Sequence, residues 1–202
     1  MKIFCIGRNY AQHAKELNNA VPTSPIVFMK PPTALLQDNQ PFYYPEFSKD
    51  IHYELEIVLR VCKNGKNVQP AFAASYYDQI ALGIDFTARD LQEKCKEKGH
   101  PWEIAKAFDH SAVLSKFRPL PATYPDGIAF SLLLDQKKVQ SGNTSDLIFS
   151  FDQLICHISK FFTLQQGDLI YTGTPSGVGP IQIGNILEGF LGEEKLLHCE
   201  VK

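Results

Sequence analysis

A long apolar stretch from Asp50 to Cys62 restricts the possible folds more than any other part of the sequence. Its composition predicts a strand, and the chain turns directly afterwards at residues 63–66, where Asn-Gly is a strong hairpin signal. A second apolar run of strand length, Gln79 to Asp85, follows it. Because such strands occur in runs along this chain, we expect a β-rich core.

The rest of the chain adds short strands and extended segments. Strand signals also occur at Ile3 to Ile6, Ile128 to Leu134, Lys138 to Gln140 and Leu169 to Tyr171. The segment 22–45 holds six of the 13 prolines, so we expect it to be extended and irregular. The chain has 202 residues and no evident internal repeat or linker. It therefore fits a single α+β, β-rich domain over residues 1–202.

Three short helices are expected, and each begins at a capping-box pattern. The paired capping residues are Asn9 with Gln12, Thr87 with Asp90, and Ser150 with Gln153. The first helix would run from Tyr10 to about Leu17, and the second would end at Gly99. The third would have an apolar face made of Leu154, Ile155, Ile158, Phe161 and Phe162. A shorter helical stretch is expected from Pro70 to Tyr77.

The composition argues against several classes of function. A net charge of −2 and a pI near 6.3 give no general attraction to nucleic acid or to anionic membranes. The mixed-sign run from Glu93 to Lys98 is most simply a solvated helix face. No apolar run approaches a membrane span, and the N-terminus does not resemble a signal peptide. Five cysteines without zinc or redox spacing indicate free thiols, so we expect a cytoplasmic protein.

Three carboxylates are the most informative residues. Glu54 and Glu56 lie two apart in the expected strand, so they share a face, with Cα atoms roughly 6–7 Å apart. Asp85 ends the second apolar run. A hard cation would relieve their repulsion and desolvation, and the absence of clustered His or Cys favours Mg²⁺, Mn²⁺ or Ca²⁺ over zinc. Spacing alone leaves another interpretation open, because Glu-x-Glu pairs on strands commonly face solvent.

A histidine, a glutamate and a lysine are further candidates for chemistry. His13 and Glu16 are three apart on the first expected helix and are therefore neighbours. Such a glutamate can orient a histidine that acts as a general base, although a pair of this kind, taken alone, more often lies at the surface without a catalytic role. Lys106 has apolar neighbours, and it either extends outward to solvent or points into a site where it holds an anion.

The glycine-rich segment Gly173 to Pro180 invites a nucleotide-binding interpretation, which its sequence does not support. It lacks the Gly-Lys-Ser/Thr of a P-loop and the spacing of a dinucleotide fingerprint. We expect its glycines to permit positive φ angles and close backbone approach to a ligand.

Taken in order, these residues resemble the fumarylacetoacetate hydrolase family, and most closely its short acylpyruvate hydrolase or oxaloacetate decarboxylase members. The resemblance extends over nearly the whole chain and rests on six groups in the correct order. These are Gly7-Arg8-Asn9-Tyr10 with His13 and Glu16; Lys30-Pro31; Glu54-Leu55-Glu56; Asp85-Phe86-Thr87-Ala88-Arg89-Asp90-Leu91-Gln92; Lys106; and Gly173-Thr174-Pro175-Ser176-Gly177-Val178-Gly179.

The resemblance implies a role for each group of residues. Glu54, Glu56 and Asp85 would bind Mg²⁺ or Mn²⁺. His13 and Glu16 would form a water-activating dyad on a short helix that acts as a lid, and Lys106 would stabilise the developing anion. The remaining implied residues line the substrate pocket: Arg8, Lys30, Arg89, Gln92 and Thr174.

The resemblance also implies a fold, an assembly and a reaction. The fold would be a mixed β-sandwich roll with short helices, comprising the catalytic domain alone and forming a homodimer. The reaction would be metal-dependent hydrolysis of a C–C bond in an acylpyruvate-type (2,4-dioxo acid) substrate, through a metal-bound pyruvate enolate. The alternatives are decarboxylation of oxaloacetate, isomerisation of a hydroxymuconate-type substrate on the same site, and a metal- or small-ligand-binding domain without catalysis.

Overall fold

The largest sheet of the computed structural model is built around two long antiparallel strands. In the described residues, 1–16, 20–122 and 126–202, it has eight strands in the order β2-β1-β12-β5-β6-β8-β3, with β9 paired to β6. Its strands are β1 (Ile3–Gly7), β2 (Ile26–Lys30), β3 (Leu35–Leu36), β5 (Leu55–Val61), β6 (Tyr77–Asp85), β8 (Ala112–Leu114), β9 (Arg118–Pro119) and β12 (Leu169–Tyr171). β5 and β6 are at the centre and are buried along most of their length.

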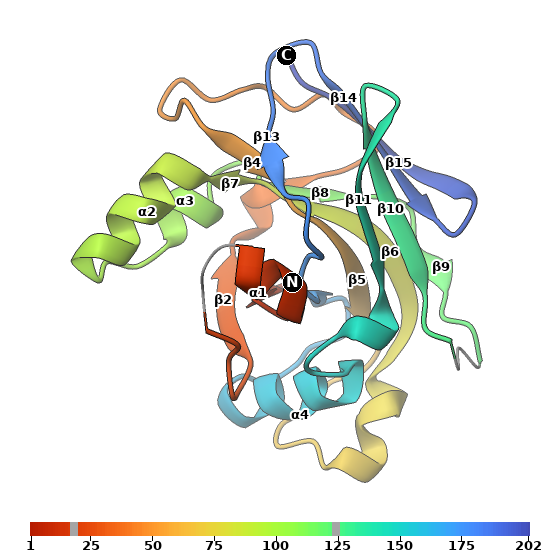
Figure 1. Ribbon diagram of the computed structural model, residues 1–202. Coiled ribbons are helices and arrows are strands. Elements are labelled where there is room, and N and C mark those ends of the chain that lie inside the picture. The colour runs from red at the N-terminus through yellow and green to blue at the C-terminus, as the bar shows by residue number, and fades with distance from the viewer. Residues whose placement is uncertain (17–19, 123–125) are drawn as a thin grey trace.

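Two smaller sheets complete the β-structure of the described chain. A four-stranded antiparallel sheet, β11-β10-β14-β15, packs on the large sheet through contacts with β5 and β6 (Figure 1). A three-stranded sheet, β13-β4-β7, lies above α1 in the view of Figure 1. Their strands are β4 (Ile51–Tyr53), β7 (Thr87–Ala88), β10 (Ala129–Leu134), β11 (Lys137–Asn143), β13 (Gly179–Pro180), β14 (Ile186–Leu191) and β15 (Glu194–Glu200).

The helices are short and lie around the sheets (Figure 1). α1 lies in front of the large sheet, α2 and α3 extend from the side of the three-stranded sheet, and α4 packs against η2 at the opposite end. Their bounds are α1 (Ala11–Glu16), α2 (Arg89–Lys98), α3 (Glu103–Lys106), α4 (Phe151–Phe161), η1 (Pro32–Ala34), η2 (Pro70–Tyr76) and η3 (Thr144–Asp146). No helix in the described ranges is long and apolar enough to cross a membrane.

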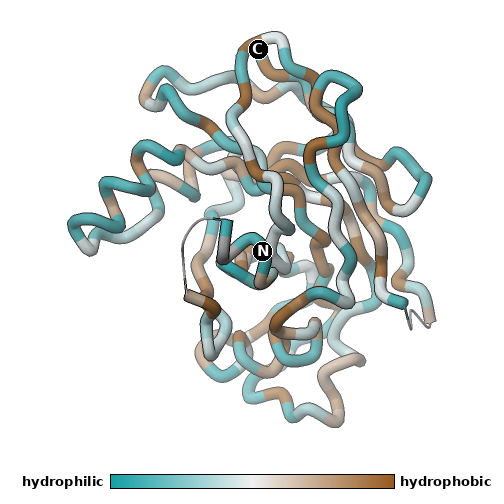
Figure 2. The backbone as a smooth tube through the Cα atoms, viewed as in Figure 1, coloured by the Kyte–Doolittle hydropathy of each residue, from teal (hydrophilic) through white to brown (hydrophobic). Residues whose placement is uncertain are grey.

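The core lies between the sheets, where Figure 2 shows the hydrophobic stretches of the backbone. A second cluster packs on the other face of the large sheet, where the Tyr171 side chain of β12 extends past β5 to Gly83 of β6. A Cβ atom on Gly83 would lie 2.4 Å from the Tyr171 ring, so only glycine fits there. The Tyr171 hydroxyl is fully buried and donates to the carbonyl of Val113 at 2.8 Å. This hydrogen bond allows the large Tyr171 ring to be buried without leaving its hydroxyl unpaired.

Most sequence-predicted elements are confirmed. The strands at residues 3–6, 79–85 and 169–171 are present, and the hairpin at 128–140 is β10 with β11. The capping box of Ser150 and Gln153 forms as predicted. The helical stretch after Pro70 is the 3-10 helix η2, and Gly99 ends α2 in the left-handed conformation. Together these agree with the predicted β-rich α+β class.

Other predictions were wrong for identifiable physical reasons. The strand from Asp50 to Cys62 is interrupted at Glu54, because β4 and β5 belong to different sheets. β6 does return antiparallel to β5, but through η2 instead of a tight turn at residues 63–66. Phe161 is 64% exposed and lies outside the apolar face of α4.

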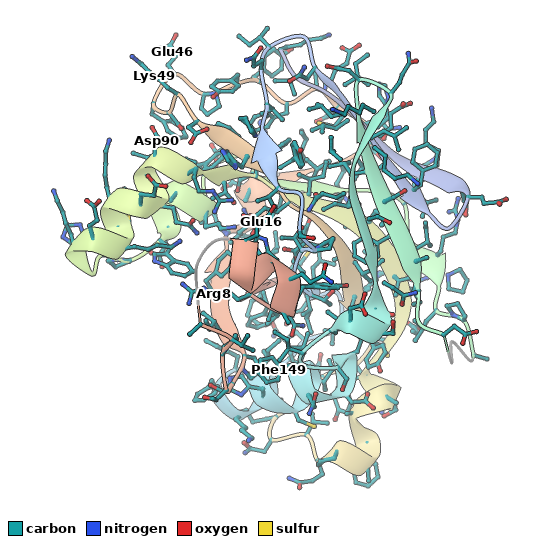
Figure 3. The ribbon with its side chains drawn as sticks, viewed as in Figure 1. Arg8, Glu16, Glu46, Lys49, Asp90 and Phe149 are labelled. Carbon is teal, nitrogen blue, oxygen red and sulfur yellow. The ribbon has the colours of Figure 1, made fainter. Side chains whose placement is uncertain are left out.

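Two of the predicted capping boxes do not form. The Asp90 carboxylate accepts from Ser48 Oγ at 2.6 Å instead of pairing with Thr87, and Figure 3 labels Asp90 near Lys49. The Asn9 side chain accepts from the backbone N–H of Phe149 at 2.8 Å, a contact across 140 residues. Tertiary partners therefore replace the local caps. The predicted end of the first helix at residue 17 lies outside the described residues.

Candidate active site

Three buried carboxylates converge at the junction of the sheets. Glu54 lies between β4 and β5, Glu56 lies in β5, and Asp85 is the last residue of β6. These residues are almost inaccessible to solvent, at 5%, 2% and 1% exposure. One oxygen from each lies within 4.8 Å of the other two. The structure thus brings together the three residues that the sequence singled out, and they face the interior instead of solvent.

The break between β4 and β5 positions the first of these carboxylates. At Glu54 the chain leaves the three-stranded sheet and enters the large one, and the carbonyl of Glu54 accepts from the backbone N–H of Asp85 at 2.9 Å. The next N–H, of Leu55, has no strand partner and donates to the side chain of Gln140 at 2.9 Å. Backbone and side-chain hydrogen bonds therefore fix the geometry on both sides of Glu54.

Three cations contact the carboxylates. Lys106 Nζ lies 2.8 Å from both Glu54 Oε2 and Asp85 Oδ2, so this lysine points into the site. Arg89 pairs with Glu54 at 2.7 Å, and Lys30 pairs with Asp85 at 2.7 Å. Lys30 also donates to Ser111 and is 2% exposed. The three carboxylates line one pocket together with Arg89 and Lys106. Lys30 is buried behind Asp85 and does not line this pocket.

The charges of the three carboxylates are not equally balanced. Burial alone would raise the pKa of Glu54, but attraction to Lys106 and Arg89 outweighs it and lowers that pKa. Burial raises the pKa of Glu56 well above its usual value, and repulsion from Asp85 and Glu54 raises it further. Within the described residues Glu56 has no salt-bridge partner; its Oε2 accepts from the Gly173 N–H at 2.7 Å.

This donor set fits a hard divalent cation. The ligands available are carboxylate oxygens, which Mg²⁺, Mn²⁺ and Ca²⁺ prefer. Repulsion from Asp85 and Glu54 raises the pKa of Glu56, and a cation bound between the three carboxylates would remove this repulsion. Among the described residues, Glu54, Glu56 and Asp85 are the acidic, His or Cys side chains that lie close enough together to hold a metal ion.

His13 and Glu16 lie next to the carboxylates. His13 is 4% exposed, lines the same pocket, and its Nδ1 lies 3.3 Å from Glu16 Oε2. Glu16, labelled on α1 in Figure 3, also accepts from the N–H of Gly177 at 3.0 Å. The dyad is thus formed, and Glu16 connects α1 to the glycine-rich segment.

The glycine-rich segment has the conformation that the sequence predicted. Gly173 and Gly177 have φ angles of +106° and +96°. Gly173 donates to Glu56 and Gly177 donates to Glu16, so the segment contacts both the carboxylates and the dyad. Thr174 lines the pocket, and its hydroxyl donates to the carbonyl of Leu55 at 2.8 Å. The segment therefore contributes backbone N–H groups to the site. No helix that could bind a phosphate follows it in the described chain.

The remaining predicted pocket residues come from α2 and from the end of β1. Arg89 and Gln92 are buried in the first turn of α2, and Arg89 Nη1 donates to Gln92 Oε1 at 2.7 Å. Arg8 follows β1 with a φ angle of +58°, an uncommon conformation for a residue other than glycine. Phe28, Lys96 and Trp102 also line the pocket. Sequence reasoning did not identify these three.

Gln140 is a further residue of this region that the sequence did not reveal. It lies in β11, is 1% exposed, and its Oε1 accepts from Leu55 between Glu54 and Glu56. Its Nε2 donates to Thr174 Oγ1 at 2.9 Å and to the carbonyl of Pro175 at 3.0 Å. One side chain therefore holds the carboxylate-bearing strand against the glycine-rich segment. No local motif marks it, because its partners lie far away in the sequence.

We expect Gln140→Met to lower the free energy of unfolding by roughly 1–3 kcal/mol, because the buried Leu55 N–H loses its acceptor. It should also weaken Mn²⁺ binding, since the backbone between Glu54 and Glu56 is freed. Urea unfolding and Mn²⁺ titration measure the two effects. Gln166→Met, at an exposed position, is the control and should change neither. Unchanged stability and Mn²⁺ affinity in Gln140→Met would contradict this role.

The fold and the buried acidic site together define a β-rich protein with the ligand set of a divalent-metal enzyme. The model of the fumarylacetoacetate (FAA) hydrolase C-terminal family matches residues 2–200. The chain therefore belongs to the fumarylacetoacetate hydrolase family, as the resemblance predicted.

Individual relatives within this family have several activities. The chain is 43% identical to the mitochondrial oxaloacetate tautomerase of Mus musculus over 99% of its length and 91% of that protein. It is 40% identical to the mitochondrial oxaloacetate decarboxylase of Dictyostelium discoideum, covering 93% of this chain and 87% of the relative. It also superposes with a TM-score of 0.93 on fumarylpyruvate hydrolase from Pseudomonas aeruginosa, solved with Mn²⁺ and pyruvate. That pair is 35% identical, and the match covers 100% of this chain and 89% of the other.

Proposed function

We propose that this chain is a divalent-metal-dependent enzyme that forms the enolate of a small 2-oxo acid. The main support is the geometry of one pocket, in which three buried carboxylates lie beside a His–Glu dyad. A domain that only bound a metal would have no use for such a dyad. The relatives named above act on oxaloacetate or fumarylpyruvate, both 2-oxo acids, which agrees with this chemistry.

Glu54, Glu56 and Asp85 would hold Mg²⁺ or Mn²⁺, with Ca²⁺ also compatible with oxygen ligands. The ion supplies Lewis-acid stabilisation of negative charge on the substrate oxygens. The Mn²⁺ in the Pseudomonas hydrolase supports the choice of ion. Lys106 remains protonated, because attraction to Asp85 and Glu54 outweighs the effect of burial and raises its pKa. Its ammonium group would therefore stabilise an anion at the same place.

The first reaction we propose is hydrolysis of an acylpyruvate. His13 accepts a proton from water, and Glu16 orients the imidazole ring through the contact to Nδ1. The resulting hydroxide adds to the distal carbonyl, the adjacent C–C bond breaks, and its electron pair remains on pyruvate as the enolate. Protonation of that carbon gives pyruvate, and the acyl part leaves as a carboxylic acid. Arg8, Arg89, Gln92 and Thr174 would line the substrate.

The second reaction is enol–keto conversion of oxaloacetate, with decarboxylation as its close variant. The identity of 43% to an oxaloacetate tautomerase favours this candidate. It requires only the loss of a proton from the enol and its return to carbon, with no attacking water. The same dyad can transfer that proton. Both reactions therefore pass through the enolate of a 2-oxo acid, which is that of pyruvate in hydrolysis and decarboxylation and that of oxaloacetate in enol–keto conversion. They differ in whether a nucleophile is used.

The metal requirement is tested by removing the ion. We expect turnover of acetylpyruvate or oxaloacetate with Mn²⁺ or Mg²⁺, a loss of roughly 100-fold or more in EDTA, and recovery when excess metal is restored. Pyruvate release and the ultraviolet absorbance of the enol are the measurements. Pyruvate from acetylpyruvate identifies a hydrolase, whereas loss of oxaloacetate enol without pyruvate identifies a tautomerase. Full turnover in EDTA would contradict the proposal.

The assembly and location are part of the same proposal. We propose a homodimer of single catalytic domains, located in the cytoplasm, without nucleic-acid or membrane partners. Light scattering of the purified protein tests the dimer.

A further inference from the structure

One face of α2 is directed at the pocket that holds the three carboxylates. Arg89, Gln92 and Lys96 are spaced i, i+3 and i+7, so they lie on the same side of the helix. All three line the pocket with the carboxylates. Lys96 belongs to the mixed-charge run that the sequence analysis assigned to a solvated face. Lys94, Lys96 and Lys98 are all exposed, as that prediction states, and of these three lysines Lys96 is the one that lines the pocket.

The cations of the pocket form two groups that differ in their partners. Arg89 and Lys106 are ion-paired with the carboxylates and lie deep in the site. Arg8 and Lys96 form no ion pair with any residue in the described part of the chain. Lys96 lies near the mouth of the pocket, where its Nζ is 6.0 Å from the centre of the Trp102 ring. Two cations that line one pocket and form no ion pair favour an anionic ligand.

The electrostatics of Lys96 agree with this geometry. Partial burial lowers its pKa, and repulsion from Arg89 and Arg8 lowers it further. An anion between Arg8 and Lys96 would remove that repulsion. Arg8 is held at this place by its left-handed backbone directly after β1, and Figure 3 shows it beside α1.

Lys96 and the carboxylates differ in their exposure to solvent. The carboxylates are at most 5% exposed and form the floor, whereas Lys96 is exposed at the rim. An oxo-acid group engaged at the floor therefore leaves its other end near Arg8 and Lys96. An apolar tail there would cover two unpaired charges without compensating them, which is costly. A second carboxylate would compensate both.

We propose that Lys96, together with Arg8, recognises a carboxylate at the far end of the substrate, so that the enzyme selects dicarboxylic 2-oxo acids. This inference rests on the proposed function, because it takes the oxo-acid end to be bound at the carboxylate floor. It makes Lys96 a specificity-determining residue that acts on substrate binding and leaves the dyad and the metal ligands unchanged.

Substitution of Lys96 tests the inference. We expect Lys96→Met to raise KM for oxaloacetate about tenfold or more, the size of one charge-assisted hydrogen bond, with little change in kcat. For acetylpyruvate, whose far end is uncharged, the same substitution should leave KM unchanged. Lys96→Arg should retain recognition of oxaloacetate. Lys98→Met is the matched control, since it removes the same charge from the opposite side of the helix.

The outcomes are distinguishable. If the unsubstituted enzyme converts oxaloacetate and Lys96→Met behaves like Lys98→Met, the inference about Lys96 is wrong and the proposed function stands. If Lys96→Met weakens oxaloacetate and acetylpyruvate equally, Lys96 does not recognise the carboxylate at the far end of the substrate and the inference is also wrong. If the unsubstituted enzyme with Mn²⁺ converts neither compound, the proposed function fails and this inference fails with it.

Discussion

Replacing Glu56 by glutamine should lower metal-dependent turnover about 1,000-fold or more and should stabilise the metal-free protein. Turnover falls because an amide is a weaker ligand than a carboxylate for a hard cation. Stability rises because Glu56 is repelled by Asp85 and Glu54 and has no salt bridge in the described residues. Glutamine keeps the shape and can still accept from the Gly173 N–H. The gain should be on the order of 1 kcal/mol, or roughly 2–4 °C in Tm.

This stabilisation should depend on pH in a defined direction. Glu56 has a raised pKa in the folded protein. Below its unfolded pKa of about 4.3, the group is protonated in both states and the substitution has little effect. Between the unfolded and the folded pKa, the folded unsubstituted protein keeps Glu56 protonated at a cost that grows with pH. Above the folded pKa it ionises Glu56 against its neighbours, and the cost no longer grows. The advantage of Glu56→Gln should therefore grow with pH and then level off.

Activity, Mn²⁺ titration and thermal unfolding in EDTA at several pH values provide the measurements. Glu194→Gln is the control, because that glutamate lies at the surface in an exposed pair with Arg118. Metal-dependent turnover near the unsubstituted level in Glu56→Gln would show that Glu56 is not a ligand. A lower Tm without metal would show that its charge is compensated in the folded protein.

Replacing His13 by glutamine should lower acylpyruvate hydrolysis by about 10²–10⁴-fold, the range typical of a general base. Decarboxylation of oxaloacetate should fall much less, because CO₂ leaves without an attacking water. Mn²⁺ affinity should remain unchanged, since His13 contacts Glu16 and is not one of the clustered ligands. Pyruvate release from both substrates and Mn²⁺ titration are the measurements.

A matched control for His13 is His157→Gln. His157 stacks on Phe161 of α4 and does not line the pocket. That variant should retain both activities. Equal losses of hydrolysis and decarboxylation in His13→Gln would mean that the dyad acts in a step common to both, such as proton transfer to the enolate carbon. The division of roles proposed here would then be wrong.

The sequence was most informative where the chemistry depends on residues close together in the chain. His13 and Glu16 could be paired from helical spacing, and Glu54 and Glu56 from their separation of two. Even there the structural reason differed from the expectation. Glu54 is not within a continuous strand but lies where the chain passes from one sheet to another. The convergence of the carboxylates therefore depends on sheet topology as well as on strand alternation.

The sequence was least informative where a side chain acts through distant partners. Gln140 contacts Leu55 and Thr174, which are 85 and 34 residues away, so no local pattern reveals it. Asp90 matched a capping pattern but binds Ser48, 42 residues away. Lys96 lies in an exposed run, as the sequence predicted, but its place at the pocket depends on where α2 packs and not on any local pattern. In each case tertiary contact, and not local propensity, decides the role of the residue.

The position of Lys106 has a consequence for how the proposed metal ion would bind. Its ammonium group already bridges Glu54 and Asp85 and acts as an internal counter-ion. Folding therefore need not wait for the ion, in contrast to small zinc domains whose metal-binding energy is their folding energy. Loading becomes an exchange of one cation for another at those oxygens. The metal-free protein should therefore be fully folded and should take up added divalent metal without a refolding step.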